Sequence, residues 1–181
     1  MLELQDAMNT RINSAWRQAG NEWYRAIWIE CAEMLDHYGW KWWKHQEPDM
    51  EQVILEIVDI WHFILSDLLE ASDDTDDIAS NIEAIMQSSC EAVEIPVAIE
   101  TLAGNTLSYR HADVDAFVQL MVAADLALDD LYRGYIGKNV LNFFRQDHGY
   151  KQGTYQKLWG GREDNEYLVE TAAALDTDSA S

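Results

Sequence analysis

The chain has 181 residues, enough for one domain with a hydrophobic core but too few for two large domains. Apolar residues make up 48% of it, yet no run reaches the roughly 18 apolar residues of a membrane span and no signal-peptide pattern opens the chain, so we expect a soluble cytoplasmic protein. The net charge of −21 would repel nucleic acid, which excludes it as the expected partner.

The first third of the chain predicts three helices. Apolar residues recur at helical spacing over 2–19, and Gly20 supplies a stop. A second helix is expected from an Asn cap at position 21 to about residue 43, and a third over 50–71, capped by Asp49. A short connection makes the second and third helices antiparallel neighbours.

The remaining chain predicts further helices and no strand pattern of useful length. We expect, in order, an acidic turn at 72–77, a helix at 76–89, shorter helices within 90–110, and a long helix at 113–146 interrupted at Gly134 and Gly137. The fold class is therefore all-α, a multi-helix bundle. Residues 1–168 form the single expected domain, and 169–181 a disordered tail.

Two apolar helices each carry a pair of acids three residues apart. AIWIECAEML contains Glu30 and Glu33, and VILEIVDIWHFIL contains Glu56 and Asp59. Residues at i and i+3 share a helix face, so four carboxylates can meet between the helices. Ionised acids in apolar surroundings need partners, and oxygen ligands suit Mg²⁺ or Mn²⁺. Buried salt bridges to Arg are the alternative, and His62 either supports the acids or packs.

A basic helix face follows in the C-terminal third, where half of the basic residues lie. In YIGKNVLNFFRQDHGYK, Lys138, Asn142 and Arg145 fall at i, i+4 and i+7, with Tyr150 and Lys151 beyond the helix end. These donors could grip phosphates, with Lys157 a weaker candidate. A solvated basic face is the alternative.

Amides and tryptophans offer candidate base contacts. Gln5 and Asn9 share one face of the first helix, where they could read a base edge or be polar surface. In GWKWWKH, core or interface packing is the expectation for Trp40, Trp42 and Trp43, and stacking on a base is the alternative.

The segments EWYRAIWIECAEMLDHYGWKWWK, EIVDIWHFILS and YIGKNVLNFFRQDHGYKQGTYQKLWGGREDN closely resemble the all-α dimeric dUTPases, members of the wider MazG-like nucleotide pyrophosphohydrolases. The resemblance covers residues 5–66 and 131–165. It implies a homodimer that hydrolyses dUTP to dUMP and pyrophosphate, with dUDP as a further candidate substrate. The nucleophile would be a metal-bound water.

The resemblance also implies roles for individual residues. The Mg²⁺ ligands would be Glu30, Glu33, Glu56 and Asp59, with Glu30 or Glu33 acting on the water. The phosphate-binding residues would be Lys138, Asn142, Arg145, Tyr150 and Lys151. The base-binding residues would be Gln5, Asn9 and Trp43, with Trp40 an alternative to Trp43.

Two other functions stay open at this point. A MazG-like enzyme for another nucleoside triphosphate, such as dCTP, would share the metal ligands and differ in the base pocket. A non-catalytic helical dimer would instead use the acidic surface to bind a basic partner.

Overall fold

The computed structural model describes residues 1–168, 170 and 171. Within them the all-α prediction is confirmed, because strands are limited to one two-stranded hairpin. The helices are α1 Leu2–Ile12, the 3₁₀ helix η1 Trp16–Gln18, α2 Trp23–Tyr38, α3 Met50–Ala71, α4 Thr75–Met86, α5 Ile95–Tyr109, α6 Val114–Ala123 and α7 Leu128–Asp147. The hairpin pairs β1 Leu158–Trp159 with β2 Arg162–Glu163. No described helix is long and apolar enough to cross a membrane.

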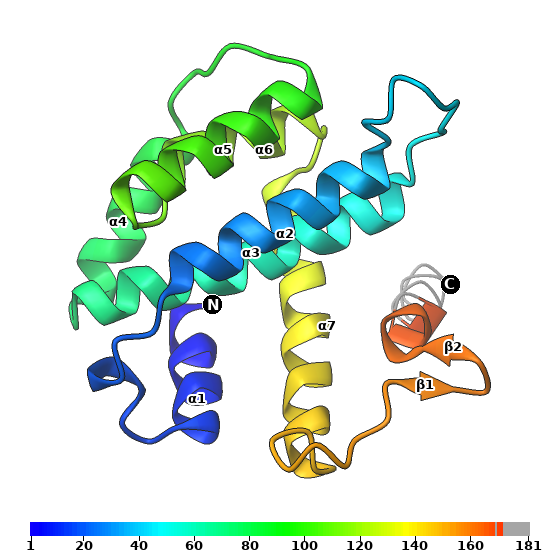
Figure 1. The fold of residues 1–181 in the computed structure, drawn as a ribbon. Helices are drawn as coiled ribbons and strands as arrows, with labels where there is room; N and C mark the ends of the chain where they lie inside the picture. Colours follow the sequence, from blue (N-terminus) through cyan, green and yellow to red (C-terminus); the bar gives the residue numbers. More distant parts are fainter. Residues whose placement is uncertain (169, 172–181) are drawn as a thin grey trace, which may run out of the picture.

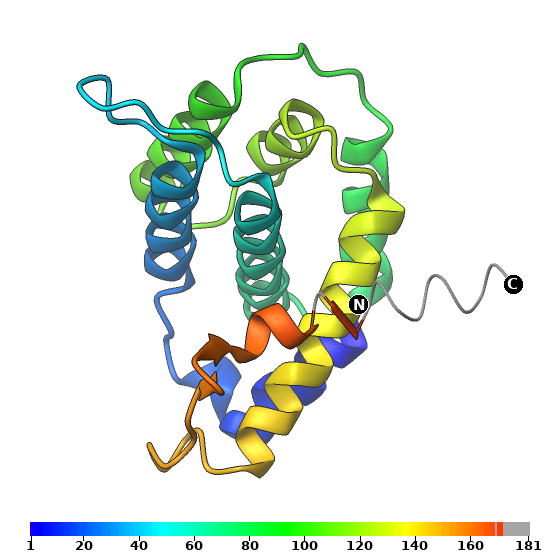
Figure 2. The same cartoon turned by 90° about the vertical axis from the view of Figure 1, so that its right-hand side faces the viewer.

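The antiparallel pair of α2 and α3 lies at the centre of the molecule (Figure 1). On one side of this pair, α5 packs against α2 and α6 packs against α5. On the other side, α1 and α7 both contact α3 and each other, so the first and last helices lie together. Figure 2 shows the hairpin and the following helical turn beside α7. This arrangement sets the acidic helix pair against α7, which carries Lys138 and Arg145.

α3 forms the centre of the core because other helices cover it on several sides. Most of its residues from Val53 to Leu69 are buried. Trp61 is fully buried, and its ring stacks on that of Phe117 at 5.0 Å between ring centroids. The Trp61 indole nitrogen also donates to the Met1 sulfur at 3.3 Å. Buried aromatic rings of this size contribute much of the apolar area that stabilises a core. α3 is therefore a rigid support for the acids it carries.

The third helix was predicted most accurately. It begins after Asp49, whose side chain accepts a hydrogen bond from the Gln52 amide at 3.2 Å, and it ends at Ala71 as expected. The second helix is shorter than predicted, because Gly39 adopts a left-handed conformation at φ 92° and ends it at Tyr38. The first helix ends at Ile12, before an extended Asn13.

The predicted breaks in the acidic region were wrong. Residues 95–109 form one continuous helix, with Pro96 in its first turn, where a missing N–H costs nothing. The break in the last long helix falls at 124–127, where Asp125 is left-handed, and not at the glycines. Gly134 instead allows close packing, since a Cβ there would lie 2.8 Å from a Val58 methyl.

Of the two packing modes predicted for the tryptophans, core packing is wrong, and interface packing stays a prediction. They lie in the loop after α2, and Trp42 is 89% exposed. Trp40 and Trp42 each make an edge contact with Trp43, at 5.2 and 5.3 Å between ring centroids. We call this group the Trp cluster. Of the predicted tail 169–181, residues 169 and 172–181 lie outside the described part of the chain.

Candidate active site

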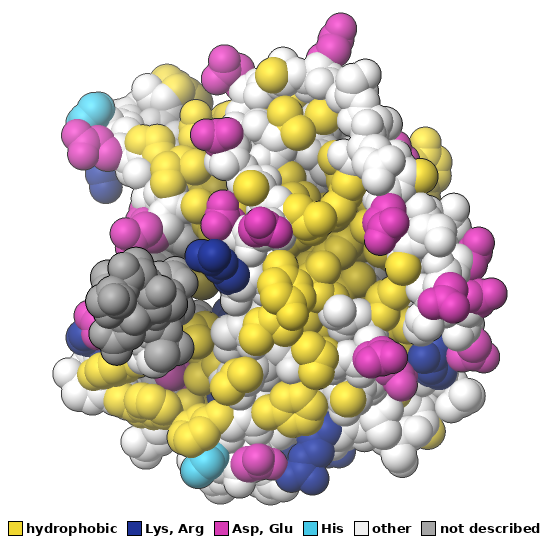
Figure 3. Space-filling view, turned by 180° about the vertical axis from the view of Figure 1, so that it is seen from behind, with side chains coloured by type: hydrophobic (Ala, Val, Ile, Leu, Met, Phe, Trp, Pro, Cys, Tyr) yellow, Lys and Arg dark blue, Asp and Glu magenta, His cyan; other side chains and the backbone are white. Residues whose placement is uncertain are grey.

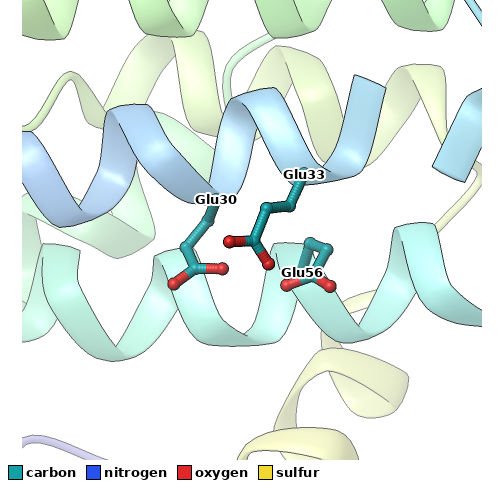
Figure 4. A group of neighbouring side chains, drawn as sticks. All are labelled: Glu30, Glu33 and Glu56. Atoms are coloured by element: carbon teal, nitrogen blue, oxygen red, sulfur yellow. The ribbon is translucent and has the colours of Figure 1, made fainter. Parts of the chain in front are cut away.

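Three of the four predicted metal ligands converge between α2 and α3. Glu30 and Glu33 project from α2 toward α3, where they meet Glu56 (Figure 4). One carboxylate oxygen from each lies within 4.8 Å of the others. The three-residue spacing on α2 places both acids on one face, and the antiparallel partner supplies the third. This carboxylate cluster could hold a cation.

Burial and mutual repulsion prevent the cluster from carrying its full negative charge on its own. Burial raises the pKa of Glu30 to about 8, assisted by its hydrogen bond with Glu56 and by the charges of Asp59 and Glu56. Burial also raises the pKa of Glu56. A divalent cation would relieve the same repulsion without protonation. The all-oxygen donor set fits a hard cation such as Mg²⁺.

His37 is a neighbour of the cluster that the sequence interpretation missed. Its Nε2 lies 3.5 Å from Glu56 Oε1. His37 follows Glu33 by four residues on α2, so helical spacing alone could have indicated it.

The fourth predicted ligand, Asp59, forms an ion pair with Lys138. Asp59 Oδ2 accepts a hydrogen bond from Lys138 Nζ at 2.7 Å. Lys138 is 4% exposed, and its Nζ also donates to Asn165 Oδ1 at 3.2 Å. A predicted metal ligand and a predicted phosphate-binding residue thus bind each other.

A cleft of about 790 Å³ joins the acidic and basic features. Glu30 and Asp59 line it from the acidic helices, whereas Glu33 and Glu56 do not. All five predicted phosphate-binding residues line it, as does the weaker candidate Lys157. The five are Lys138, Asn142, Arg145, Tyr150 and Lys151. The predicted basic stripe therefore faces the acids across one cleft.

Arg145 is held by a residue that the sequence interpretation did not single out. Asp164 accepts from Arg145 Nε at 2.8 Å and from Nη2 at 2.7 Å, and from the Tyr155 hydroxyl at 2.8 Å. Burial opposes ionisation of Asp164, yet the bonds from Arg145 and Tyr155 keep its pKa below the usual range. The only sequence signal was the REDN tetrapeptide after the glycines.

The predicted base-reading amides are buried, so the polar-surface alternative is wrong. Gln5 and Asn9 are 4% and 5% exposed, and both line the cleft. Gln5 Nε2 donates to Asn9 Oδ1 and to Ser66 Oγ, while its Oε1 lies 2.8 Å from His62 Nδ1 and accepts from the Tyr135 hydroxyl. The four polar contacts of Gln5 make it a structural centre for this end of the cleft.

The same contacts fix the state of His62. An amide oxygen only accepts, so Nδ1 carries the proton and Nε2 is left as an acceptor. Nε2 is buried and has no hydrogen-bond partner among the described residues. Burial lowers the pKa of His62 to about 3, so the ring is neutral. His62 therefore packs at the amide end of the cleft, near Gln5 and Asn9, against the Tyr135 ring at 4.3 Å between centroids.

Trp43 lies apart from the cleft. It belongs to the Trp cluster, is 57% exposed, and does not line the cleft in the single chain. The aromatic residues at the amide end are Trp16, Trp23 and Phe63, which sequence reasoning did not distinguish from core. The rings of Trp23 and Phe63 lie 6.4 Å apart.

Comparison with known proteins places this geometry in a family. A family model described as dUTPase matches residues 1–150, which is most of the chain. The chain belongs to the dUTPase family. Membership implies dUTP diphosphatase activity and agrees with the all-α fold. No curated protein matches the chain. Asp164 lies beyond the part of this dUTPase that the family model covers.

Proposed function

We propose that this dUTPase hydrolyses dUTP, and also dUDP, in a Mg²⁺-dependent reaction, with Mn²⁺ as a substitute. The products would be dUMP with pyrophosphate from dUTP and with phosphate from dUDP. The observation that supports this most directly is that Glu30 of the carboxylate cluster and Asp59 line the same cleft as the phosphate-type donors.

Glu30, Glu33 and Glu56 are the proposed metal ligands, and Asp59 would join them on releasing Lys138. When bound, Mg²⁺ would neutralise the carboxylates, bind phosphate oxygens and make a water molecule more acidic.

Glu30 and Glu33 are the proposed proton acceptors for the attacking water. Glu30 lines the cleft, where its carboxylate could accept a proton from the attacking water. At the basic end, Lys138, Lys151 and Arg145 would offset charge that develops on the phosphates. Asn142 and Tyr150 are proposed to orient them, and Gln5, Asn9 and the neighbouring aromatic rings to enclose the base.

Substitution of Glu33 by Gln tests the proposal. It removes one charge from the cluster without changing the side-chain size, and it should lower kcat by about 100-fold or more with an unchanged helical content. Glu83→Gln on the exposed face of α4 is the matched control. Parent-level turnover by Glu33→Gln would show that the site is misassigned.

The substrate panel is dUTP, dUDP, dTTP, dCTP and UTP with Mg²⁺, with pyrophosphate and phosphate measured separately. Preference for dCTP would support the MazG-like alternative. No turnover and no Mg²⁺-dependent thermal shift would support the non-catalytic dimer.

We also propose that the chain forms a homodimer. Two exposed apolar features support this. One is the Trp cluster, and the other is a set of exposed apolar side chains on α7, Leu128, Tyr132, Val140 and Phe144. Figure 3 shows hydrophobic side chains gathered on the face opposite to that of Figure 1. Contiguous apolar surface of this kind is typical of subunit contacts.

A further inference from the structure

Among the described residues, four of the five N–H groups of the Arg145 guanidinium have acceptors and one has none. Nε donates to Asp164 Oδ2, and Nη2 donates to Asp164 Oδ1 and, at 3.1 Å, to Asn165 Oδ1. Nη1 donates one hydrogen to Asn142 Oδ1 at 3.3 Å. Arginine has five N–H bonds, so a single hydrogen on Nη1 remains for a ligand. It lies on the side of the guanidinium that Asn142, a cleft residue, also occupies.

Asp164 is built to hold this arrangement. Its side chain is 0% exposed and that of Arg145 is 8% exposed. The β1–β2 hairpin leads into Asp164, whose amide donates to the Lys157 carbonyl at 2.9 Å. The Tyr155 hydroxyl adds a third donor to the Asp164 carboxylate. Backbone and side chain of Asp164 are thus both fixed.

We propose that Asp164 is a positioning residue for the reaction, which sets the plane of the Arg145 guanidinium so that its Nη1 meets the substrate phosphates. The inference rests on the proposed function and extends it to a segment beyond residue 150, where the family match ends. A planar donor held through two parallel bonds keeps its orientation, whereas a free arginine samples many rotamers.

The ion pairs around the cleft give its basic side chains different roles. Asp164 neutralises Arg145, and Asp59 neutralises Lys138, at 2.7 Å in both cases. Lys151 and Lys157 line the cleft with no carboxylate partner among the described residues. Arg145 therefore supplies a hydrogen-bond donor of fixed orientation, while these two lysines supply net positive charge for substrate binding. Loss of Asp164 would leave the positive charges of Lys151 and Lys157 in place, but the orientation of the Arg145 guanidinium would no longer be fixed.

Asp164→Asn tests this division. The variant keeps the side-chain size, adds one net positive charge to the cleft and breaks the bidentate pair. It should lower kcat about 10- to 100-fold, since small misplacements of a donor have effects of this size, and leave KM for dUTP unchanged or lower. Glu166→Gln is the matched control, because Glu166 pairs with an arginine in the same segment but its side chain is 44% exposed, against 0% for Asp164. It should keep parent kinetics.

Two further measurements separate positioning from simple stabilisation. In NMR spectra the Arg145 Nε–H should exchange slowly with water in the parent and fast in Asp164→Asn, a readout that needs no turnover. In a double-mutant cycle, Asp164→Asn should have little further effect on kcat in an Arg145→Lys background. If Asp164→Asn does not fold, Tyr155→Phe, which removes one donor to Asp164, should give a smaller fall in kcat at unchanged KM.

Parent-like kcat in folded Asp164→Asn, or equal proton exchange at Arg145 in the two proteins, would overturn the inference. A parent chain that hydrolyses no nucleotide would instead overturn the proposed function, and the exchange measurement would still test the clamp on Arg145.

Discussion

The raised pKa of Glu30 makes the stability of the metal-free protein depend on pH. Between pH 4.5 and about 8 the folded chain holds a proton at Glu30 that the unfolded chain has released. Stability therefore falls as the pH rises through this window. At about 1.4 kcal/mol per pKa unit the full effect would be about 5 kcal/mol. Glu30 is partly exposed and shares its proton with Glu56, so about half of this is expected.

Thermal unfolding in EDTA at pH 5 and pH 8 measures the effect. A loss of roughly 2–3 kcal/mol corresponds to a fall of about 5–10 °C in Tm for a chain of this length. Glu30→Gln should flatten the pH dependence, because glutamine does not titrate. Glu83 is an exposed acid of α4 outside the cluster, so Glu83→Gln removes the same charge and should keep the dependence. Mg²⁺ should stabilise the parent more at pH 8 than at pH 5, since it binds the deprotonated acids.

The reasoning fails if Glu30→Gln and the parent lose the same Tm between pH 5 and pH 8. In that case the dependence would come from the general repulsion of an acidic surface and not from the cluster.

Two other predictions concern Lys138 and the subunit contact. Lys138→Met removes the partner of Asp59 and should cost about 2 kcal/mol of stability, below the range for fully buried pairs because Asp59 is 22% exposed. It should also lower turnover yet increase the Mg²⁺-dependent shift in Tm, and an unchanged shift would argue against Asp59 as a ligand. Light scattering should give a dimer mass for the parent and a monomer mass for at least one of Trp42→Lys and Val140→Lys. A monomeric parent would contradict the dimer, and Leu107→Lys on α5 is the control.

Local sequence signals were sufficient for α3 and for the acids it carries. Asp49 provides the cap, Pro48 precedes it, and the apolar run interrupted by two acids fixes both the helix and its acidic face. The glycines misled the interpretation of α7, because their effect depends on tertiary contacts. Gly134 lies inside the helix against Val58, while the real break uses a left-handed Asp125 that composition does not reveal.

The candidate site shows the same division between local and long-range information. Spacing on α2 brought Glu30 and Glu33 to one face, and this needed no knowledge of the fold. The pairing of Asp59 with Lys138 and of Arg145 with Asp164 joins residues far apart in the chain, so spacing alone could not assign it. The resemblance supplied the residue types of the basic stripe without showing that two of its cations are already paired.

The meeting of the first and last helices has a consequence for the order in which the protein assembles. The acidic pair of α2 and α3 spans about 50 consecutive residues and can form as soon as they are synthesised. The basic end requires contacts across most of the chain, with Arg11 bound to Asp147 and Lys151 Nζ donating to the Ile12 carbonyl at 2.5 Å. Contacts between such distant residues form late, since a long loop must close first. A growing chain would thus carry its carboxylates before it can hold a triphosphate, so complete nucleotide binding would arise only near the end of synthesis.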